Sequence, residues 1–285
     1  MGAKILDGKA LAATMKGEIK AEVAAFKEQQ GVVPGITVVQ VGADPASERY
    51  VRQIGRTFEE VGMVFSLRQP EASITQAEMV DLLQELNGDP TVSGIIVQMP
   101  LPKHIPQDVV ASAISPLKDV DGINPANAGR LLAGTGRFFA PATPSGGMEI
   151  LRREGVDLAG KRAVVVGRSN IVGKPMALLL LHQHATVTIC HSRTRDLPAV
   201  CREGDILVAA IGKARFITAD MIKPGAVVID FGVNVVGGKA VGDVDFEAAQ
   251  AVAAAITPVP GGTGPMTNVM LLRNTLEAAR MLLAG

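Results

Sequence analysis

A glycine-containing segment at 161–175, KRAVVVGRSNIVGKP, restricts the possible folds of this chain more than any other stretch. Its apolar run at 163–166 predicts a buried parallel strand that enters a tight turn at Gly167. A helix is expected to begin near Ile171 and to run through 176–181. This order is typical of a site for a nucleotide phosphate, because the unpaired N–H groups and the positive dipole end of a helix attract negative charge.

The glycine spacing of this segment is unusual for such a site. Gly167, Ser169 and Gly173 stand where the common dinucleotide fingerprint has G-x-G-x-x-G. The segment by itself is equally compatible with an ordinary glycine turn between a strand and a helix of any α/β protein. Residues further along the chain decide between the two interpretations.

The run at 185–190, ATVTIC, predicts the next buried strand, and the residues after it indicate the cofactor. An NAD-binding unit places an acid here to bind the ribose 2′-hydroxyl, but this chain has His191, Ser192 and Arg193. A hydroxyl beside a cation suits a 2′-phosphate, and Arg168 offers a second guanidinium. The pattern favours NADP over NAD. The alternative is that these residues are ordinary solvent-exposed loop cations with no ligand.

Predicted strands and helices alternate along the whole chain, which indicates an α/β fold with parallel sheets and ligands at the carboxyl ends of the strands. We expect two lobes: an N-terminal α/β lobe at 1–140, to which a C-terminal helix at 268–285 returns, and a Rossmann-type lobe at 141–267. The predicted helices lie at 9–29, 46–61, 75–86, near 143–153 and at 268–283; Thr75 and Glu78 are expected to form a capping box, and Thr143 to cap the fourth helix. The other predicted strands lie at 35–41, 63–67, 93–98, 205–210, 226–231 and 254–259.

Composition excludes several classes of function. Of the 285 residues 47% are hydrophobic, enough for a sizeable core, and Lys plus Arg equal Asp plus Glu at 28 each. Balanced charge and 3% aromatic residues argue against a nucleic-acid partner and against an acidic membrane surface. Cys190, Cys201 and the four histidines have no metal-binding spacing, so no metal site is expected, and both cysteines are expected to be buried apolar side chains in a reducing compartment. The amino terminus has no continuous apolar region of a signal peptide, which predicts a cytoplasmic protein.

Four positions in the first lobe are candidates for chemistry. Tyr50 and Ile54 share one face of a predicted helix, Gln98 ends a predicted strand, and Asp121 follows in a loop. An aromatic ring, an amide and a carboxylate suit a flat heterocycle with an amino-pyrimidinone edge: Tyr50 can stack on it and Asp121 can accept two N–H bonds. Ordinary loop and cap hydrogen bonds would explain Gln98 and Asp121 equally well.

Several motifs closely resemble one enzyme family over essentially the whole chain. They are Tyr50-Val51, Gly94-Ile-Ile-Val-Gln-Met-Pro-Leu-Pro102, Lys118-Asp-Val-Asp-Gly122, Gly167-Arg-Ser-Asn-Ile-Val-Gly173, Val241-Gly-Asp-Val244 and the segment 257–267. The chain resembles the bifunctional methylenetetrahydrofolate dehydrogenase/methenyltetrahydrofolate cyclohydrolase family. The resemblance implies a homodimeric cytosolic enzyme that oxidises 5,10-methylenetetrahydrofolate with NADP⁺ and then hydrolyses the methenyl product to 10-formyltetrahydrofolate.

The resemblance also implies roles for individual residues. Tyr50 would stack on the folate, Gln98 would lie beside the reacting centre, and Asp121 would anchor the pterin. The NADP site would include Gly167, Arg168, Ser169, Ser192 and, beside the nicotinamide, Val233. Arg193 joins this set because a cation beside Ser192 suits a 2′-phosphate. The loop around Pro260, Gly261 and Gly262 would close over the folate.

One position departs from the family pattern Tyr-Val-x-x-Lys-x-Lys. This chain has Ile54 in place of the first lysine and Arg56 in place of the second. Isoleucine can neither transfer a proton nor place a positive charge beside the reacting carbon, and Arg56 lies roughly opposite Ile54 on the helix. Hydride transfer depends mainly on positioning, whereas hydrolysis needs proton handling. We therefore expect a dehydrogenase with weak or absent cyclohydrolase activity.

Two other functions are compatible with the same residues. An NADP-dependent dehydrogenase of a different pterin, or of a small imine or carbonyl compound, would use Ile54 to pack an apolar substituent. A non-catalytic NADP-binding paralogue would bind the dinucleotide and reduce none of it with any folate. A panel of substrates with NADP⁺ reduction as the signal separates these cases.

Overall fold

The computed structural model describes residues 2–284, and the chain forms two compact units. Unit 1 comprises Met1–Ala13 and Thr143–Thr267, and unit 2 comprises Thr14–Ala142 and Asn268–Gly285. The first thirteen residues, which the sequence interpretation placed in the N-terminal lobe, therefore group with unit 1. The reason is strand pairing, because β1 (Lys4–Ile5) runs parallel to β11 (Ala255–Ile256).

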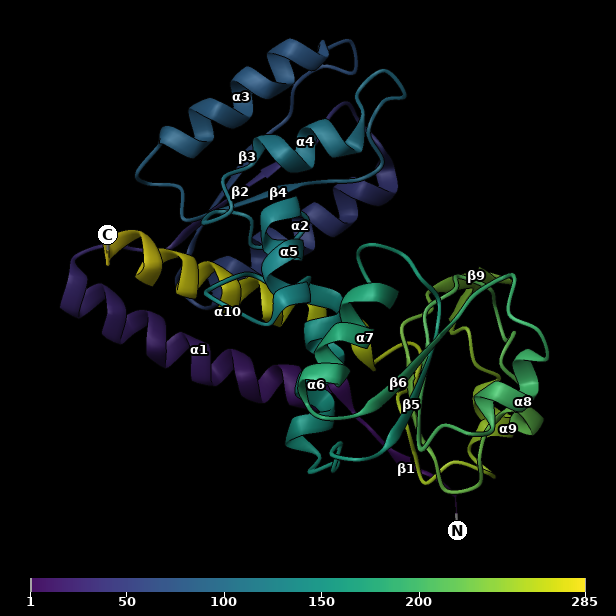
Figure 1. Cartoon of the computed structure of the whole chain (residues 1–285). Coiled ribbons are helices and arrows are strands. Elements are labelled where there is room, and N and C mark those ends of the chain that lie inside the picture. The colour runs from purple at the N-terminus through teal and green to yellow at the C-terminus, as the bar shows by residue number, and fades with distance from the viewer. Residues whose placement is uncertain (1, 285) are drawn as a thin grey trace. The chain divides into compact units, whose positions relative to one another are not determined.

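Unit 1 contains a six-stranded sheet in the order β1-β11-β8-β7-β5-β6, in which every neighbouring pair is parallel (Figure 1). Its remaining strands are β5 (Arg162–Val166), β6 (Thr186–Cys190), β7 (Ile206–Ala209) and β8 (Val227–Asp230), with a separate antiparallel hairpin of β9 (Asn234–Val236) and β10 (Lys239–Val241). Its helices are α6 (Ala142–Arg153), which begins at the unit boundary, α7 (Gly173–His182), α8 (Leu197–Cys201), α9 (Phe246–Ala249) and the 3-10 turn Ala219–Met221.

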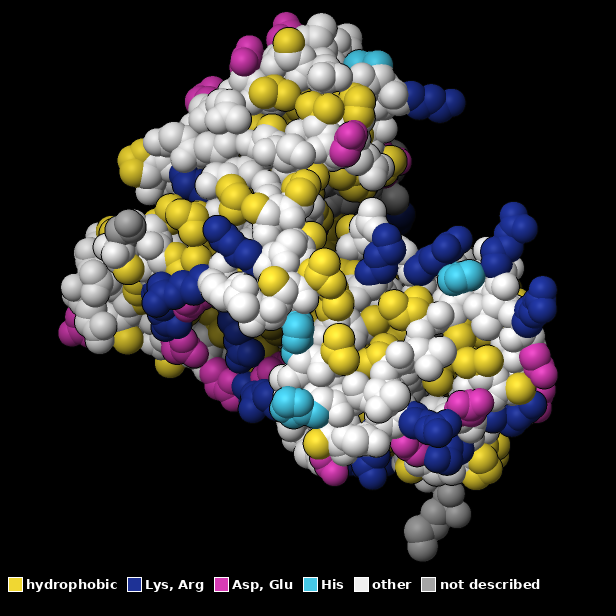
Figure 2. Space-filling model, viewed as in Figure 1, with side chains coloured by type: hydrophobic (Ala, Val, Ile, Leu, Met, Phe, Trp, Pro, Cys, Tyr) yellow, Lys and Arg dark blue, Asp and Glu magenta, His cyan; other side chains and the backbone are white. Residues whose placement is uncertain are grey.

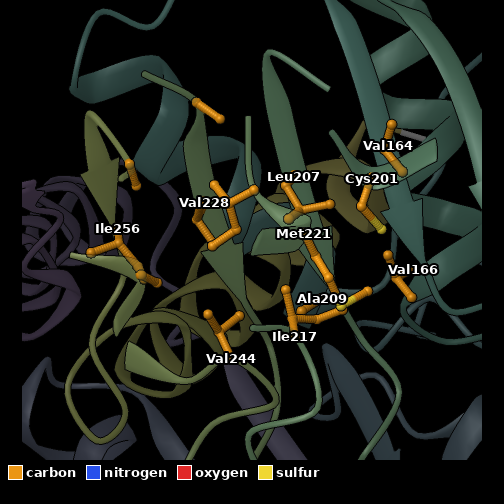
Figure 3. Close-up of a cluster of buried hydrophobic side chains, with 14 of the residues drawn as sticks. Val164, Val166, Cys201, Leu207, Ala209, Ile217, Met221, Val228, Val244 and Ile256 are labelled. Atoms are coloured by element: carbon orange, nitrogen blue, oxygen red, sulfur yellow. The ribbon is translucent and has the colours of Figure 1, made fainter. Parts of the chain in front are cut away.

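The core of unit 1 explains why its strands read as continuous apolar runs. Val164, Leu207 and Val228, on three neighbouring strands, are each at most 1% exposed and belong to one cluster (Figure 3). Cys201 of α8 joins this cluster, and Cys190 belongs to it too; both cysteines are free and buried, as predicted. Parallel strands covered on both faces need apolar side chains on both faces.

Unit 2 is built on a three-stranded parallel sheet in the order β3-β2-β4. Its strands are β2 (Gly35–Val39), β3 (Val64–Arg68) and β4 (Gly94–Val97), and its helices are α2 (Pro45–Glu60), α3 (Gln76–Gly88), α4 (Gln107–Ala113) and α5 (Pro125–Ala133). Helices α1 (Gly8–Gln30) and α10 (Thr263–Leu283) each begin in unit 1 and continue into unit 2. Asp44 caps α2, and Thr75 and Glu78 form the predicted capping box of α3.

The two faces of the unit 2 sheet have different neighbours. Val39 and Ile95 point to the face that packs against Met79 and Leu83 of α3. On the opposite face, a Cβ on Gly55 of α2 would meet the ring of Phe65 in β3. Helix α2 therefore packs directly on that second face.

Three predicted boundaries differ from the structure. Helix α7 begins at Gly173 rather than near Ile171, and α10 begins at Thr263, five residues before the predicted Asn268. Thr143 lies inside the first turn of α6 instead of capping it from outside. In the part of the chain that the structure describes, no helix is both long enough and apolar enough to cross a membrane.

Candidate functional site

The turn between β5 and α7 packs so tightly that two of its positions have no room for a side chain. Gly167 has a φ of 133°, and a Cβ there would meet the carbonyl oxygen of Ala210. A Cβ on Gly173 would meet the carbonyl of Gly167 and the amide nitrogen of Arg168. Both glycines are thus needed to bring the helix start against the end of the strand, which is the close approach that a pyrophosphate loop requires.

The N–H groups at the start of α7 were expected to be unpaired, but two of them have a hydrogen-bond acceptor. The N–H groups of Val172 and Gly173 donate to the Ser169 hydroxyl oxygen at 3.1 and 3.3 Å. Ser169 therefore satisfies two of the orphan donors of the helix and brings its own O–H group to the helix start. A phosphate at this position would meet the serine hydroxyl beside the positive end of the helix dipole.

The loops after β5 and β6 lie side by side. Val166 pairs with Cys190 at the ends of the two strands, and the Gly167 N–H donates to the Cys190 carbonyl at 2.9 Å. Ser192 and Arg193, at the start of the second loop, are exposed. Figure 2 shows Lys and Arg side chains gathered along the part of unit 1 that carries α7 and β9, with one His among them. The predicted phosphate-binding residues thus lie at the ends of adjacent strands.

The sheet order places this turn at a topological switch point. The chain passes from β5 to β6 on one side and then to β7 on the other side of β5. In open parallel sheets a ligand binds outside the carboxyl ends of the strands at such a point. The fit to a dinucleotide phosphate therefore depends on the glycine turn, on Ser169 and on the neighbouring cations, and the three residues directly after β6, at 191–193, include no acid to bind a 2′-hydroxyl.

The remaining predicted residues of unit 1 lie in two other loops. Val233 is 70% exposed and stands between β8 and the β9–β10 hairpin. Gly261 is fixed by its carbonyl, which accepts the Lys9 N–H at 2.9 Å, and a Cβ on Gly262 would meet the Pro258 carbonyl. The loop at 260–262 is held by backbone contacts within unit 1, which set its conformation.

Tyr50 and Asp121 come together in unit 2. Burial raises the pKa of Tyr50 well above its ordinary value, and the charge of the nearby Asp121 raises it further. Burial, followed by the charge of Asp119, raises the pKa of Asp121 to about 7. Gln98 follows β4, and its Nε2 donates to the Met99 carbonyl at 2.8 Å. The aromatic ring and the carboxyl predicted to bind a heterocycle are therefore close enough for the charge of Asp121 to act on the Tyr50 hydroxyl.

Asp119, which the sequence interpretation did not single out, supports this arrangement. Its buried carboxylate accepts the N–H groups of Ile123 and Asn124 at 3.0 and 2.8 Å, and Nδ2 of Asn127 at 2.8 Å. Its backbone pairs with Ile95 of β4 in a parallel bridge. The segment that carries Asp121 thus runs along the end of β4, next to Gln98, and Asp119 fixes it there.

Ile54 and Arg56 have opposite environments on α2. Ile54 is 1% exposed, one turn after Tyr50, whereas Arg56 is exposed. The Arg56 guanidinium therefore does not share the buried environment of Ile54. Within residues 2–284 the structure contains no cluster of three or more His, Cys, Asp or Glu that could hold a metal ion.

The two units together define a class of protein. Unit 1 is a Rossmann-type dinucleotide-binding fold with a phosphate turn at its switch point, and unit 2 presents a tyrosine and a carboxyl at the ends of a parallel sheet. This combination is that of a dinucleotide-dependent dehydrogenase with a separate substrate-binding unit.

Comparison with known proteins identifies the family within this class. The catalytic domain of tetrahydrofolate dehydrogenase/cyclohydrolase matches residues 6–121, and the NAD(P)-binding domain of the same family matches residues 141–283. The chain therefore belongs to the tetrahydrofolate dehydrogenase/cyclohydrolase family.

Relatives match over nearly their full length. The chain is 57% identical to the bifunctional protein FolD of Moorella thermoacetica over 98% of this chain and 100% of that one. The crystal structure of the FolD methylenetetrahydrofolate dehydrogenase/cyclohydrolase of Campylobacter jejuni is 44% identical, with a TM-score of 0.96 over 98% of this chain and 99% of that one. The Trypanosoma brucei enzyme, solved with NADP and an inhibitor, is 38% identical, with a TM-score of 0.94 over 100% of both chains.

Proposed function

We propose that this protein oxidises 5,10-methylenetetrahydrofolate to 5,10-methenyltetrahydrofolate by hydride transfer to NADP⁺. The observation that carries the proposal is the match of both domains of the family, at residues 6–121 and 141–283, in a chain whose unit 1 has a dinucleotide turn at its switch point. When bound, NADP⁺ supplies the hydride acceptor. The residues of the chain bind and orient the two molecules, which is the main catalytic requirement of a hydride transfer.

In this proposal each residue of unit 2 acts on a different part of the folate. Tyr50 stacks on the pterin, and the ionised Asp121 carboxylate accepts N–H bonds from its amino-pyrimidinone edge. Gln98 lies by the carbon that loses the hydride. Residues Pro260, Gly261 and Gly262 are proposed as further substrate contacts.

The cofactor is proposed to be NADP rather than NAD. Ser169, Ser192 and the guanidinium groups of Arg168 and Arg193 would bind the phosphates, with Val233 beside the nicotinamide. Support comes from the absence of an acid at 191–193, directly after β6, and from the NADP-bound relative. Purified protein with 5,10-methylenetetrahydrofolate should form NADPH far faster than NADH, and failure to reduce either nucleotide would refute the function.

The second activity of the family, hydrolysis of the methenyl product, is proposed to be weak or absent. Ile54 is buried at the position of the family lysine and has no group to transfer a proton, whereas positioned acid–base groups typically contribute about 10²- to 10⁴-fold. Dehydrogenation is expected to proceed, since it depends on positioning.

The test is to follow NADPH formation and methenyl decay separately in the wild type and in Ile54→Lys. We expect the lysine to raise hydrolysis about 10²-fold and to leave hydride transfer within about threefold. Ile54→Met, which keeps an apolar side chain, and Arg56→Lys, on the exposed face, are the matched controls and should raise neither rate. Rapid enzyme-catalysed hydrolysis by the wild type would refute the split between the two activities.

A homodimer is proposed as the working form, and the surface of unit 1 supports it. Strand β6 lies at one end of the sheet order, and its Ile189 is 43% exposed. Val235, in the β9–β10 hairpin of the same unit, is 76% exposed. An exposed apolar edge strand is a ready site for pairing with a second copy. Light scattering should give twice the chain mass for the wild type and the chain mass for Ile189→Lys.

We propose a cytoplasmic location for this enzyme. The two free cysteines, both buried in the core of unit 1, fit a reducing compartment. Fractionation of cells that produce the protein, with detection by antibody, tests this directly.

A further inference from the structure

A fully buried carboxylate, that of Asp243, lies at the carboxyl end of the unit 1 sheet and has no role in the proposed function. Its side chain is 0% exposed. It accepts the backbone N–H groups of three consecutive residues, Ile211 at 2.7 Å, Gly212 at 2.9 Å and Lys213 at 2.8 Å. It also accepts Nδ2 of Asn234 at 3.0 Å. All the donors that the described part of the chain offers to this carboxylate are thus uncharged N–H groups.

The donors belong to the loops that follow two central strands. Residues 211–213 come directly after β7, and Asn234 comes shortly after β8. The loop after β7 lies at the switch point, where the Ala210 carbonyl packs against Gly167 of the phosphate turn. One carboxylate therefore ties together two loops on the far side of the switch point from the loop that carries Ser192.

The position of Asp243 is itself fixed by a second buried carboxylate. Asp230, at the end of β8, accepts the N–H groups of Asp243 and Val244 at 3.1 and 2.9 Å. A Cβ on Gly232 would meet the Asp243 carboxylate, and a Cβ on Gly242 would meet the Asp230 carboxylate. The two aspartates and two glycines form one interlocked unit with no spare volume.

We infer that Asp243 is a positioning residue for the nicotinamide half of the dinucleotide site, an inference that rests on the proposed function. Three successive amides of a loop have no helix or strand to pair with, so the carboxylate replaces that pairing and holds the loop in one conformation. The phosphate end of the site lies on the loops after β5 and β6, and no hydrogen bond of Asp243 reaches those loops. Loss of the carboxylate should therefore disturb one half of the cofactor and spare the other.

The experiment compares two ligands in the full-length protein by calorimetry. The first is NADP⁺, and the second is 2′,5′-ADP, which has the adenosine end and no nicotinamide. Asp243→Asn keeps the shape of the side chain and removes one acceptor oxygen. We expect it to weaken NADP⁺ binding by about 10- to 100-fold, because the displaced loops no longer hold the nicotinamide half of the cofactor. Binding of 2′,5′-ADP should stay within about twofold of the wild type, a negligible free-energy change.

The matched control is Asp205→Asn in the same unit. Asp205 also accepts a backbone N–H, that of Arg162 at 2.9 Å, but it precedes β7 at the opposite end of the strand. It should change neither affinity. A milder variant, Asn234→Ala, removes one donor and leaves the carboxylate in place, and it tests the same role if Asp243→Asn does not fold. It should weaken NADP⁺ binding by about two- to tenfold, the effect of one hydrogen bond, and leave 2′,5′-ADP binding unchanged.

The outcomes separate this inference from the proposed function. Parallel loss of NADP⁺ and 2′,5′-ADP binding, or no change in either, overturns the role of Asp243. The two binding measurements need no folate, so a wild type that binds both nucleotides but oxidises no folate refutes the proposed function while the role of Asp243 is still decided.

Discussion

At the scale of single residues, the titration of Asp121 is expected to control folate binding. Burial and the charge of Asp119 raise its pKa to about 7. Above that pH the carboxylate is ionised and can accept two N–H bonds, and as the pH falls through about 7 it gains a proton and loses acceptor capacity. The value of kcat/KM for the folate should therefore rise with pH through about 7, measured as initial rates of NADPH formation between about pH 5.5 and 8.5.

The Asp121→Asn variant tests whether Asp121 is the group that causes this pH dependence. An amide of the same shape does not titrate, so the variant should have a low kcat/KM that no longer changes across this range. A variant profile that keeps the wild-type slope would show that another group is responsible.

Sequence alone located Asp121 but not the residue that holds it. Asp119 and Asp121 share one short motif, and only the structure shows that Asp119 is fully buried and binds Ile123 and Asn124 while the charge of Asp121 acts on Tyr50. Residues two apart would share one side of an extended segment, but the chain turns at 120–121. Spacing alone therefore does not reveal which of the two carboxyls packs into the interior.

At the scale of elements, the junction of β5 and α7 depends on the absence of a side chain at position 173. A methyl group on Gly173 would meet the backbone of Gly167 and Arg168, so Gly173→Ala must push α7 away from the turn. We expect this substitution to weaken NADP⁺ binding by at least about tenfold, since the phosphate contacts depend on that approach. Calorimetric titration with NADP⁺ measures it.

Gly17 is the matched control for that substitution. It lies exposed inside α1, and no heavy atom would lie within 4 Å of an added Cβ. Gly17→Ala should leave NADP⁺ binding unchanged and stabilise the helix by about 0.5–1 kcal/mol. Equal loss of NADP⁺ binding in both variants would contradict the steric argument.

The elements that sequence located well are those with strong local signals, and the ones it missed have weaker or ambiguous signals. The capping box at Thr75 and the apolar strands of both sheets were predicted within a few residues. The start of α10 at Thr263 was missed because a Gly-Pro pair is typical of loops, although Pro265 is tolerated in a first helical turn.

Two short elements were not predicted at all. The hairpin β9–β10 was overlooked although it has a recognisable turn, Gly237-Gly238, both with positive φ. Strand β1 had none, because two residues pair with partners 251 positions later.

At the scale of the whole molecule, the C-terminal helix α10 holds the loop that carries Asp121, although about half of the chain separates the two in sequence. Asn274 of α10 donates from Nδ2 to the Val120 carbonyl at 2.8 Å, between Asp119 and Asp121. On the same helix Thr275 lies next to Gly94 of β4, where an added Cβ would meet its hydroxyl at 3.2 Å. The residues after 267 are therefore part of the folate-binding unit, although all of unit 1 from 143 onward separates them from it in sequence.

This long-range contact predicts a specific kinetic effect. Asn274→Ala leaves the Val120 carbonyl without its donor and frees the segment that carries Asp121, a loss of about 1–2 kcal/mol that should appear as a five- to thirtyfold lower kcat/KM for the folate. The KM for NADP⁺ should not change. Arg280→Ala, on the same helix, removes exposed ion pairs with Glu22 and Glu277, each worth about 0–1 kcal/mol, and should alter neither constant. If Asn274→Ala instead raised both KM values together, the helix would act through overall stability, and thermal unfolding of the two variants would show that as a lowered transition for Asn274→Ala.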